Sequence, residues 1–266
     1  MQLTGLFIYP IKACAGIAIE QANVVERGLE RDRRYMIVDR AGTFVTQRTL
    51  PQLCQVATAL SGPSIVVSAP NKAAFELPCE LSSSADLAKS PYQVWGSSGS
   101  ALVHAEGSRW FSEYLNDDVS LVYMPDEEQR AVNPARARPG DIVSFADGYP
   151  LLLISEASLD ELNRRLDEPL DMRRFRPNLV ISGCAPHAED GFAELQIGPV
   201  ALRGVKRCDR CVVTTIDPDT GAKGKEPLRT LAQYRLEDGK VWFGMNLIHD
   251  GSGTLRVGDA VTVYGQ

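Results

Sequence analysis

The chain has 266 residues, 44% of them hydrophobic, which suffices for one large or two small domains with a buried core. Its net charge of −6 argues against a protein that binds nucleic acid through a broad basic face. The longest apolar run, Tyr149 to Ile154, is far shorter than the roughly 18 residues of a transmembrane helix. No signal peptide is evident, because Pro10 and Lys12 interrupt the first apolar run. We therefore expect a soluble cytoplasmic protein with no membrane or nucleic-acid partner.

Short strands and turns dominate the first 120 residues. Asp39 to Gly42 predict a hairpin turn, Leu81–Lys89 an exposed loop and Arg109–Leu115 a helix. Apolar runs bounded by turn residues predict seven strands, namely Leu3–Ile8, Ile17–Val25, Tyr35–Val38, Thr43–Thr46, Leu53–Ala59, Ser64–Val67 and Ser120–Tyr123.

The segment Pro125–Gly140 is charged and holds three prolines, so we interpret it as a linker or cover loop between two halves. Beyond it, Glu156–Arg165 is the clearest helix, with Ser155 as its cap and three leucines on one face, Leu159, Leu162 and Leu166. The strands expected in the second half are Leu179–Ser182, Leu195–Ile197, Val200–Leu202, Cys211–Thr215, Val241–Leu247, Leu255–Val257 and Val261–Tyr264. This pattern predicts a mainly β (α+β) protein with a barrel and a few helices. Nucleotide-binding glycine motifs are absent from the sequence.

Six cysteines are present, and only Cys208 and Cys211 lie close together, as Cys-Asp-Arg-Cys. A zinc site would need further ligands, and His187 and His249 are distant in sequence. A thioredoxin-like redox pair is disfavoured, because the residues that follow resemble a strand. Two readings remain open for this pair: ordinary cysteines near a strand, or thiolates favoured by neighbouring basic residues such as Arg210.

Three more clusters combine cations with turn residues: Lys12 after Tyr9-Pro10-Ile11, the arginines of Gly28–Arg34, and Arg176 with Asn178. Each could be a solvated turn whose ion pairs contribute little. Each could also bind an anion, because arginine offers a forked donor and lysine a point charge.

Eight motifs follow one another in order along the chain. They are YPIK at Tyr9–Lys12, GLERDRR at Gly28–Arg34, TQRTLP at Thr46–Pro51, FRPNLVISG at Phe175–Gly183, CDRCVVTTIDPDTG at Cys208–Gly221, EPLRTLAQYR at Glu226–Arg235, FGMN at Phe243–Asn246 and VGDAV at Val257–Val261. Together they resemble the MOSC family, the molybdenum cofactor sulfurase C-terminal-like proteins. Within that family the chain is similar to the mitochondrial amidoxime-reducing components and to bacterial reductases of N-hydroxylated bases. The resemblance implies an N-terminal MOSC β-barrel-like domain over residues 1–120 and a MOSC domain over 121–266, with the cofactor between them.

The resemblance also implies roles for individual residues. Cys211 matches the family's protein ligand of molybdenum, and Lys12 and Arg33 match the residues that hold the cofactor phosphate. Arg176 and Asn178 match positions that contact the pterin or line the metal pocket. Three further positions belong to the same site: Asp147 as a proton donor or substrate contact, Tyr149 beside the cofactor, and Asn246 near the reacting group. The chain departs from the mitochondrial relatives at Ala13, Gly148, Tyr149 and Asn246, which leaves substrate fit and phosphate affinity open.

The function implied is a molybdenum enzyme that reduces N-hydroxylated compounds, such as hydroxylamines, amidoximes or N-hydroxylated bases, to amines. Some bacterial relatives carry a ferredoxin domain with a CxxxxCxxC motif, and this sequence contains no such motif. We therefore expect a separate electron donor, a ferredoxin- or cytochrome b5-like protein. The alternatives are a carrier of the cofactor or a sulfur-handling protein without reductase activity, and a barrel that has lost its cofactor.

Overall fold

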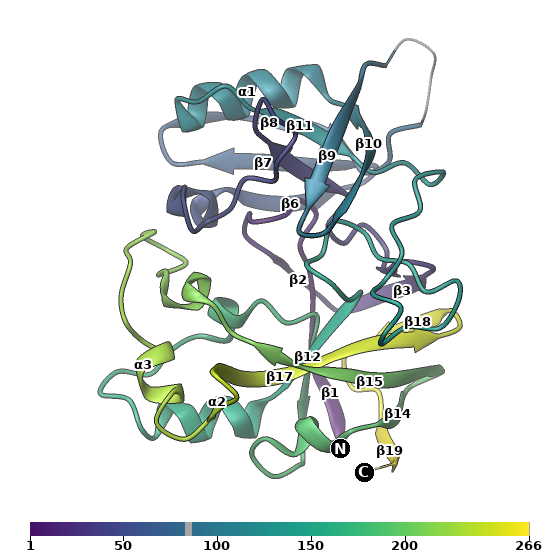
Figure 1. The fold of residues 1–266 in the computed structure, drawn as a ribbon, viewed down its shortest axis with the longest axis vertical. Helices are drawn as coiled ribbons and strands as arrows, with labels where there is room; N and C mark the ends of the chain where they lie inside the picture. Colours follow the sequence, from purple (N-terminus) through teal and green to yellow (C-terminus); the bar gives the residue numbers. More distant parts are fainter. Residues whose placement is uncertain (83–86, 266) are drawn as a thin grey trace.

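The computed structural model describes residues 1–82 and 87–265, and strands account for most of the regular structure there (Figure 1). The predicted mainly β class is confirmed. The strands are β1 Gln2–Ile8, β2 Ile17–Ile19, β3 Gln21–Val25, β4 Gly28–Leu29, β5 Tyr35–Val38, β6 Ala57–Ser61, β7 Ser64–Ala69, β8 Lys72–Pro78, β9 Lys89–Val94, β10 Ser97–Val103, β11 Ser120–Tyr123, β12 Leu151–Ser155, β13 Leu179–Ser182, β14 Glu194–Ile197, β15 Val200–Asp209, β16 Leu236–Glu237, β17 Lys240–Asp250, β18 Gly253–Arg256 and β19 Val261–Gly265. The helices are α1 Ala105–Leu115, α2 Glu156–Asn163 and α3 Leu228–Leu231, with 3-10 turns η1 Pro51–Gln55, η2 Met172–Phe175, η3 Ala188–Gly191 and η4 Val212–Thr215.

The largest sheet has the strand order β19-β14-β15-β17-β12-β13-β1-β2, with β16 paired to β17. β12 and β13 are parallel neighbours, and the other pairs along this order are antiparallel. β1 comes from the start of the chain, yet it pairs with β13. The two ends of this order also meet, because Gln2 bridges Ala260 and the Val261 amide donates to the Met1 carbonyl at 3.0 Å, at the lower edge of Figure 1.

The upper part of Figure 1 holds the four-stranded sheet β5-β11-β10-β9, the three-stranded sheet β6-β7-β8 and helix α1. α1 begins at a His104 cap, whose ring nitrogen accepts a hydrogen bond from the Gly107 amide at 3.0 Å. Its buried face carries Trp110, Phe111 and Leu115, which join the apolar core of this part. The burial of this face explains why the helix packs here despite its short length.

Between β11 and β12 the chain forms a packed loop, in which the buried side chain of Arg130 makes three of the anchoring contacts. Arg130 donates to the carbonyls of Ser144, Ala146 and Asp147 at 2.5–2.9 Å. These bonds fix the backbone on which Asp147 is carried. Arg130 belongs to Pro125–Gly140, the segment expected to be a linker or cover loop, so that segment is anchored to the residues that follow it.

Helix α2 is confirmed at its predicted position. Ser155 caps it, since its hydroxyl accepts a hydrogen bond from the Ser158 amide at 3.1 Å. The helix ends at Asn163, two residues before the predicted end. No helix in the part of the chain that the structure describes is both long and apolar enough to cross a membrane.

Several sequence predictions for strands are wrong. Cys211–Thr215 is a 3-10 turn, because the Thr214 and Thr215 hydroxyls donate to the carbonyls of Cys211 and Val212 at 3.0 and 2.8 Å. The predicted strand Leu53–Ala59 is a 3-10 turn in its first half and joins β6 only from Ala57.

Thr43–Thr46 is not a strand either, and forms only isolated bridges at Thr43 and Phe44. Strands β8, β9 and β10 were not predicted, because none of them has a clear run of buried apolar residues. Part of the loop predicted at Leu81–Lys89 lies outside the described residues.

Candidate functional site

A cavity of about 180 Å³ opens where the two parts of the molecule meet. All eight side chains that the sequence assigned to a site line it: Lys12, Arg33, Asp147, Tyr149, Arg176, Asn178, Cys211 and Asn246. Ala13, Gly148 and Cys208 line it as well. Segments that are far apart in sequence thus contribute to one wall.

The backbone of this wall adopts an unusual conformation at four positions, one of which is Trp95 with a φ of 52°. Ala13, Arg33 and Arg176 have positive φ angles of 71°, 49° and 55°. Non-glycine residues rarely adopt this left-handed conformation, and they keep it only where the surrounding structure enforces it. Here the Lys12 and Arg33 amides are held by the carbonyls of Tyr35 and Tyr9, each at 2.8 Å.

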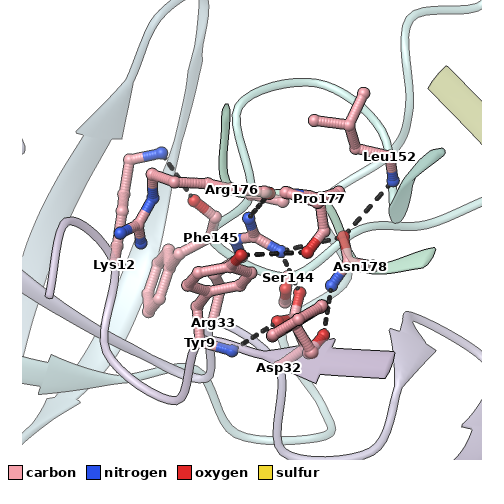
Figure 2. A network of polar contacts seen from close by, with 12 residues as sticks. Tyr9, Lys12, Asp32, Arg33, Ser144, Phe145, Leu152, Arg176, Pro177 and Asn178 are labelled. Atoms are coloured by element: carbon pink, nitrogen blue, oxygen red, sulfur yellow. Dashed lines mark hydrogen bonds and ion pairs between the residues drawn. The ribbon is translucent and has the colours of Figure 1, made fainter. Parts of the chain in front are cut away.

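A buried polar network orients Arg33 (Figure 2). The Asp32 carboxylate accepts hydrogen bonds from the Tyr9 amide at 2.8 Å and from Arg33 Nη1 at 2.6 Å. Arg33 Nη1 also donates to Asn178 Oδ1 at 3.0 Å, and Asn178 Nδ2 donates to the Phe7 carbonyl at 3.1 Å. Asn178 is 1% exposed, and its Oδ1 also accepts a hydrogen bond from the Leu152 amide at 3.3 Å, so it ties Arg33 to the backbone of β1 and β12.

Tyr9 connects the two arginines of the site. The guanidinium carbons of Arg33 and Arg176 each lie 4.3 Å from the centroid of its ring. Its hydroxyl donates to the Pro177 carbonyl at 2.9 Å, and burial raises the pKa of Tyr9 to about 12 despite the two cations. The ring therefore stays neutral and stabilises both cations through its face.

Positive charge exceeds negative charge in the cavity wall. Six cationic side chains line it, Lys12, Arg33, Arg48, Arg174, Arg176 and Arg210, against two carboxylates, Asp147 and Asp209. Lys12, Arg33 and Arg174 have ion pairs, whereas the other three have none within residues 1–82 and 87–265. Buried Arg210 Nη2 also lacks a hydrogen-bond partner in that part of the chain. This cavity therefore suits an anionic ligand, although the chain as a whole is acidic.

Lys12 and Asp147 form an ion pair at the mouth of the cavity. Lys12 Nζ donates to Asp147 Oδ1 at 2.5 Å and to the Phe145 carbonyl at 2.8 Å. Although the surrounding protein partly desolvates the Asp147 carboxylate, the Lys12 ammonium and the Trp95 indole N–H together hold its pKa well below its usual range. The carboxylate is thus ionised at neutral pH, which favours a hydrogen-bond acceptor and disfavours the predicted role as proton donor.

Cys208 is the penultimate residue of β15 and Cys211 precedes η4, so only two residues separate the two cysteines, and both line the cavity. Burial raises the pKa of Cys208, which disfavours its thiolate. Within the described residues, no three His, Cys, Asp or Glu side chains gather closely enough to hold a metal ion. A metal bound to Cys211 would therefore need most of its ligands from a cofactor or solvent.

The sequence analysis missed Arg48 and Trp95, which line the cavity, and Arg130, which supports the backbone that carries Asp147. Arg48 belongs to the motif at Thr46–Pro51, and its place in that motif was a usable signal. Arg130 lies in the segment interpreted as a linker, and Trp95 lies in a two-residue turn between strands that were not predicted. Their roles depend on contacts made only in the folded protein.

Comparisons with known proteins place the chain in a family. Residues 1–118 match the model of the MOSC N-terminal beta barrel domain, and residues 140–262 match the MOSC domain. The human mitochondrial amidoxime-reducing component 1 is 34% identical over 98% of this chain and 82% of its own length. The mouse protein of that name is 36% identical over the same shares, and the rat mitochondrial amidoxime reducing component 2 is 36% identical over 96% and 81%. The chain belongs to the MOSC family.

Proposed function

We propose that the protein is a molybdenum-cofactor-dependent reductase that converts N-hydroxylated compounds to amines. The observation that carries this proposal is the cavity, where an excess of cations surrounds a thiol, Cys211, that has no partner residues for a protein-only metal site in the described chain. The names of the relatives support the reaction class, because they are called amidoxime-reducing components.

The donor set of the cavity fits a molybdenum cofactor. The cofactor carries a phosphate dianion, which suits a lysine point charge and arginine donors such as Lys12 and Arg33. Arg176 and the unpartnered Nη2 of Arg210 offer further donors for its pterin or phosphate oxygens. The Cys211 thiolate is a soft ligand and suits a metal whose other sulfur ligands come from the cofactor. When bound, the cofactor supplies the two-electron redox chemistry of the reaction.

The chain's own residues would bind and orient the substrate. An amidoxime becomes an amidine by taking up two electrons and two protons, and water leaves. Asp147 is an ionised acceptor at the mouth, so it can hold an N–H or O–H of the substrate. Its side chain is 71% exposed, so the protons can reach the site from solvent. Tyr149 and Asn246 line the remaining wall and limit the shape of the substrate.

The electrons would come from a separate protein, and we propose a ferredoxin- or cytochrome b5-like donor. We also propose the cytoplasm as the compartment. All six cysteines are free thiols, which suits a reducing environment.

The metal and pterin content of protein from a host that makes the cofactor tests the proposal. We expect roughly one molybdenum per chain, retained in Cys208→Ser and lost in Cys211→Ser, because only Cys211 ligates the metal. Reduction of amidoximes with a reduced dye should follow the metal content. Unchanged molybdenum and turnover in Cys211→Ser would contradict the ligand assignment, and bound molybdenum without reduction of any N-hydroxylated compound would contradict the reductase.

A further inference from the structure

Trp95 lies at the mouth of the cavity, although it belongs to the upper part of the molecule. It occupies the turn between β9 and β10, a hairpin that descends toward the lower part in Figure 1. Its side chain lines the cavity and the residue is 46% exposed. The indole therefore serves neither as a core residue nor as an isolated surface residue.

The backbone of Trp95 is in a conformation that disfavours a bulky residue. Its φ is 52°, in the left-handed region, and Gly96 completes a two-residue turn between Val94 and Ser97. Glycine, asparagine and aspartate are the residues that such turns favour. A tryptophan here costs conformational free energy that the turn alone does not require. Such local strain is typical of residues kept for function.

Three contacts hold the indole in place. Its Nε1–H donates to Asp147 Oδ1 at 3.2 Å, the Arg48 guanidinium carbon lies 4.8 Å from its centroid, and the Phe44 ring lies at 5.1 Å. The Phe44 segment is itself tied to β9, because the Phe44 amide donates to the Gln93 carbonyl at 3.2 Å. An aromatic surface is thus preorganised next to the carboxylate at the mouth.

We propose that Trp95 determines substrate specificity by stacking on planar, conjugated N-hydroxylated substrates while Asp147 accepts a hydrogen bond from them. This inference rests on the proposed function and names the substrate class of that site. Planar ligands gain from a fixed aromatic face, and removal of such a face lowers binding about tenfold to hundredfold. An aliphatic substrate with the same reacting group gains much less from the ring.

The test compares benzamidoxime, which is planar and aromatic, with acetamidoxime, which carries the same N-hydroxylated group on a methyl. In the molybdenum-loaded protein, Trp95→Asn should lower kcat/KM for benzamidoxime at least tenfold more than for acetamidoxime. The loss should appear mainly in KM, because stacking stabilises the bound substrate and the transition state alike. Asparagine accepts the backbone conformation, so Tm should stay equal or rise.

Trp95→Phe is the matched control. It keeps an aromatic face but lacks the N–H, so it should retain most of the preference for benzamidoxime. The proposal would be overturned if kcat/KM of Trp95→Asn fell equally for both substrates. It would also be overturned if Trp95→Phe lost as much kcat/KM for benzamidoxime as Trp95→Asn does. Loss of bound molybdenum in Trp95→Asn would also overturn it, since Trp95 would then hold the cofactor.

Direct binding separates this inference from the proposed function. Benzamidoxime should quench tryptophan fluorescence more than acetamidoxime does, and Trp95→Asn should remove the difference, because Trp110 and Trp242 are buried. If the loaded wild type reduces neither amidoxime, the reductase proposal fails, while selective quenching by benzamidoxime would still support stacking at Trp95. Equal quenching by both compounds would contradict the stacking.

Discussion

The surroundings of Glu189 and the cavity at Lys12 both contain buried charged groups. The two regions differ in which groups compensate the buried charge. Glu189 is 0% exposed, and its carboxylate accepts hydrogen bonds from the Ser155 amide, the Ser155 hydroxyl and the Ser158 hydroxyl at 2.7–3.1 Å. Neutral donors thus compensate its burial. In the cavity, by contrast, cations outnumber carboxylates, and Arg176 has no ion-pair partner in the described chain.

The difference shows which kind of buried polarity indicates a site. A carboxylate whose acceptor positions are filled by its own chain stabilises the fold and offers nothing to a ligand. Cations that lack counter-charges and face a cavity destabilise the empty protein and favour an anion. The four predictions below test this contrast, two in each region.

The largest effect is expected at Glu189. Glu189→Ala leaves the two serine hydroxyls and the Ser155 amide without their acceptor, which should lower the free energy of unfolding by about 3 kcal/mol or more. Glu189→Gln keeps the shape and one acceptor oxygen, so its loss should be smaller. Urea unfolding measures both. A loss below about 1 kcal/mol in the alanine variant would mean that this cluster is not a stabilising unit.

The next effect concerns pH and His187, which lies beside Ser158. Both ring nitrogens are buried without a partner among the described residues, and burial lowers the pKa of His187 to about 4. Since the unfolded pKa is about 6.5, its contribution to stability is full above that pH and is lost as the pH falls toward 4. The loss should be on the order of 2 kcal/mol at pH 5.

Urea unfolding at pH 7 and pH 5 checks this prediction against His187→Asn, because asparagine tolerates the left-handed φ of 62°. The variant should lose less stability between the two pH values than the wild type does. His104, whose pKa is also lowered by burial, contributes equally to both proteins. The same loss in both proteins would contradict the role given to His187.

In the cavity, Arg176→Gln should affect ligand binding more than folding. The free energy of unfolding should change by less than about 1 kcal/mol, or rise, because the change removes one unpaired cation from a positive site. Bound inorganic phosphate raises Tm by an amount that depends on its affinity. In Arg176→Gln this rise should be smaller, and should correspond to a phosphate affinity about tenfold lower than in the wild type. Arg173→Gln is the control: Arg173 is already paired with Asp171 and Asp219, so its loss should leave phosphate binding unchanged.

The smallest effect is expected at Asp147. Asp147→Asn removes the carboxylate that pairs with Lys12, so phosphate should bind about threefold more tightly, by roughly 0.6 kcal/mol. Stability should fall only modestly, because buried Lys12 loses its counter-charge but keeps its hydrogen bond to the Phe145 carbonyl. The same Tm titration measures this gain. Weaker phosphate binding would show that Asp147 orients Lys12 for the anion instead of competing with it.

Local sequence patterns predicted the elements whose cause is local. Helix α2 has its serine cap and apolar face within ten residues, and β13 is a continuous apolar run. The strand predicted at Cys211–Thr215 was wrong, because threonine hydroxyls bond to nearby carbonyls there, and this competes with the strand preference of Val212 and Val213. Strand β8 buries only Leu77, and β9 buries only Tyr92 and Val94, so neither has the run of apolar residues that marks a strand in sequence.

The residues of the candidate site were predictable where they belong to a recognised motif. Roles that depend on packing between distant segments were not. Motifs placed Lys12, Arg33 and Cys211 at one cavity, and the structure brings them there. The role of Asn178 as a support for Arg33 depends on contacts with Phe7 and Arg33 from distant segments. The position of Trp95 at the cavity depends on the pairing of β9 with the chain near Phe44, and no local sequence pattern shows this pairing.

The pairing of β1 with β13 has a consequence for the timing of synthesis. Lys12 and Arg33 are synthesised before Arg176, Cys211 and β17, because they precede them in the chain. Contacts between such distant segments form slowly, because a long loop must close before they give any stabilisation. The cavity is therefore complete only after β17 has been made and has joined the sheet, so a ligand that needs the whole cavity cannot guide the folding of the segment that carries Lys12 and Arg33.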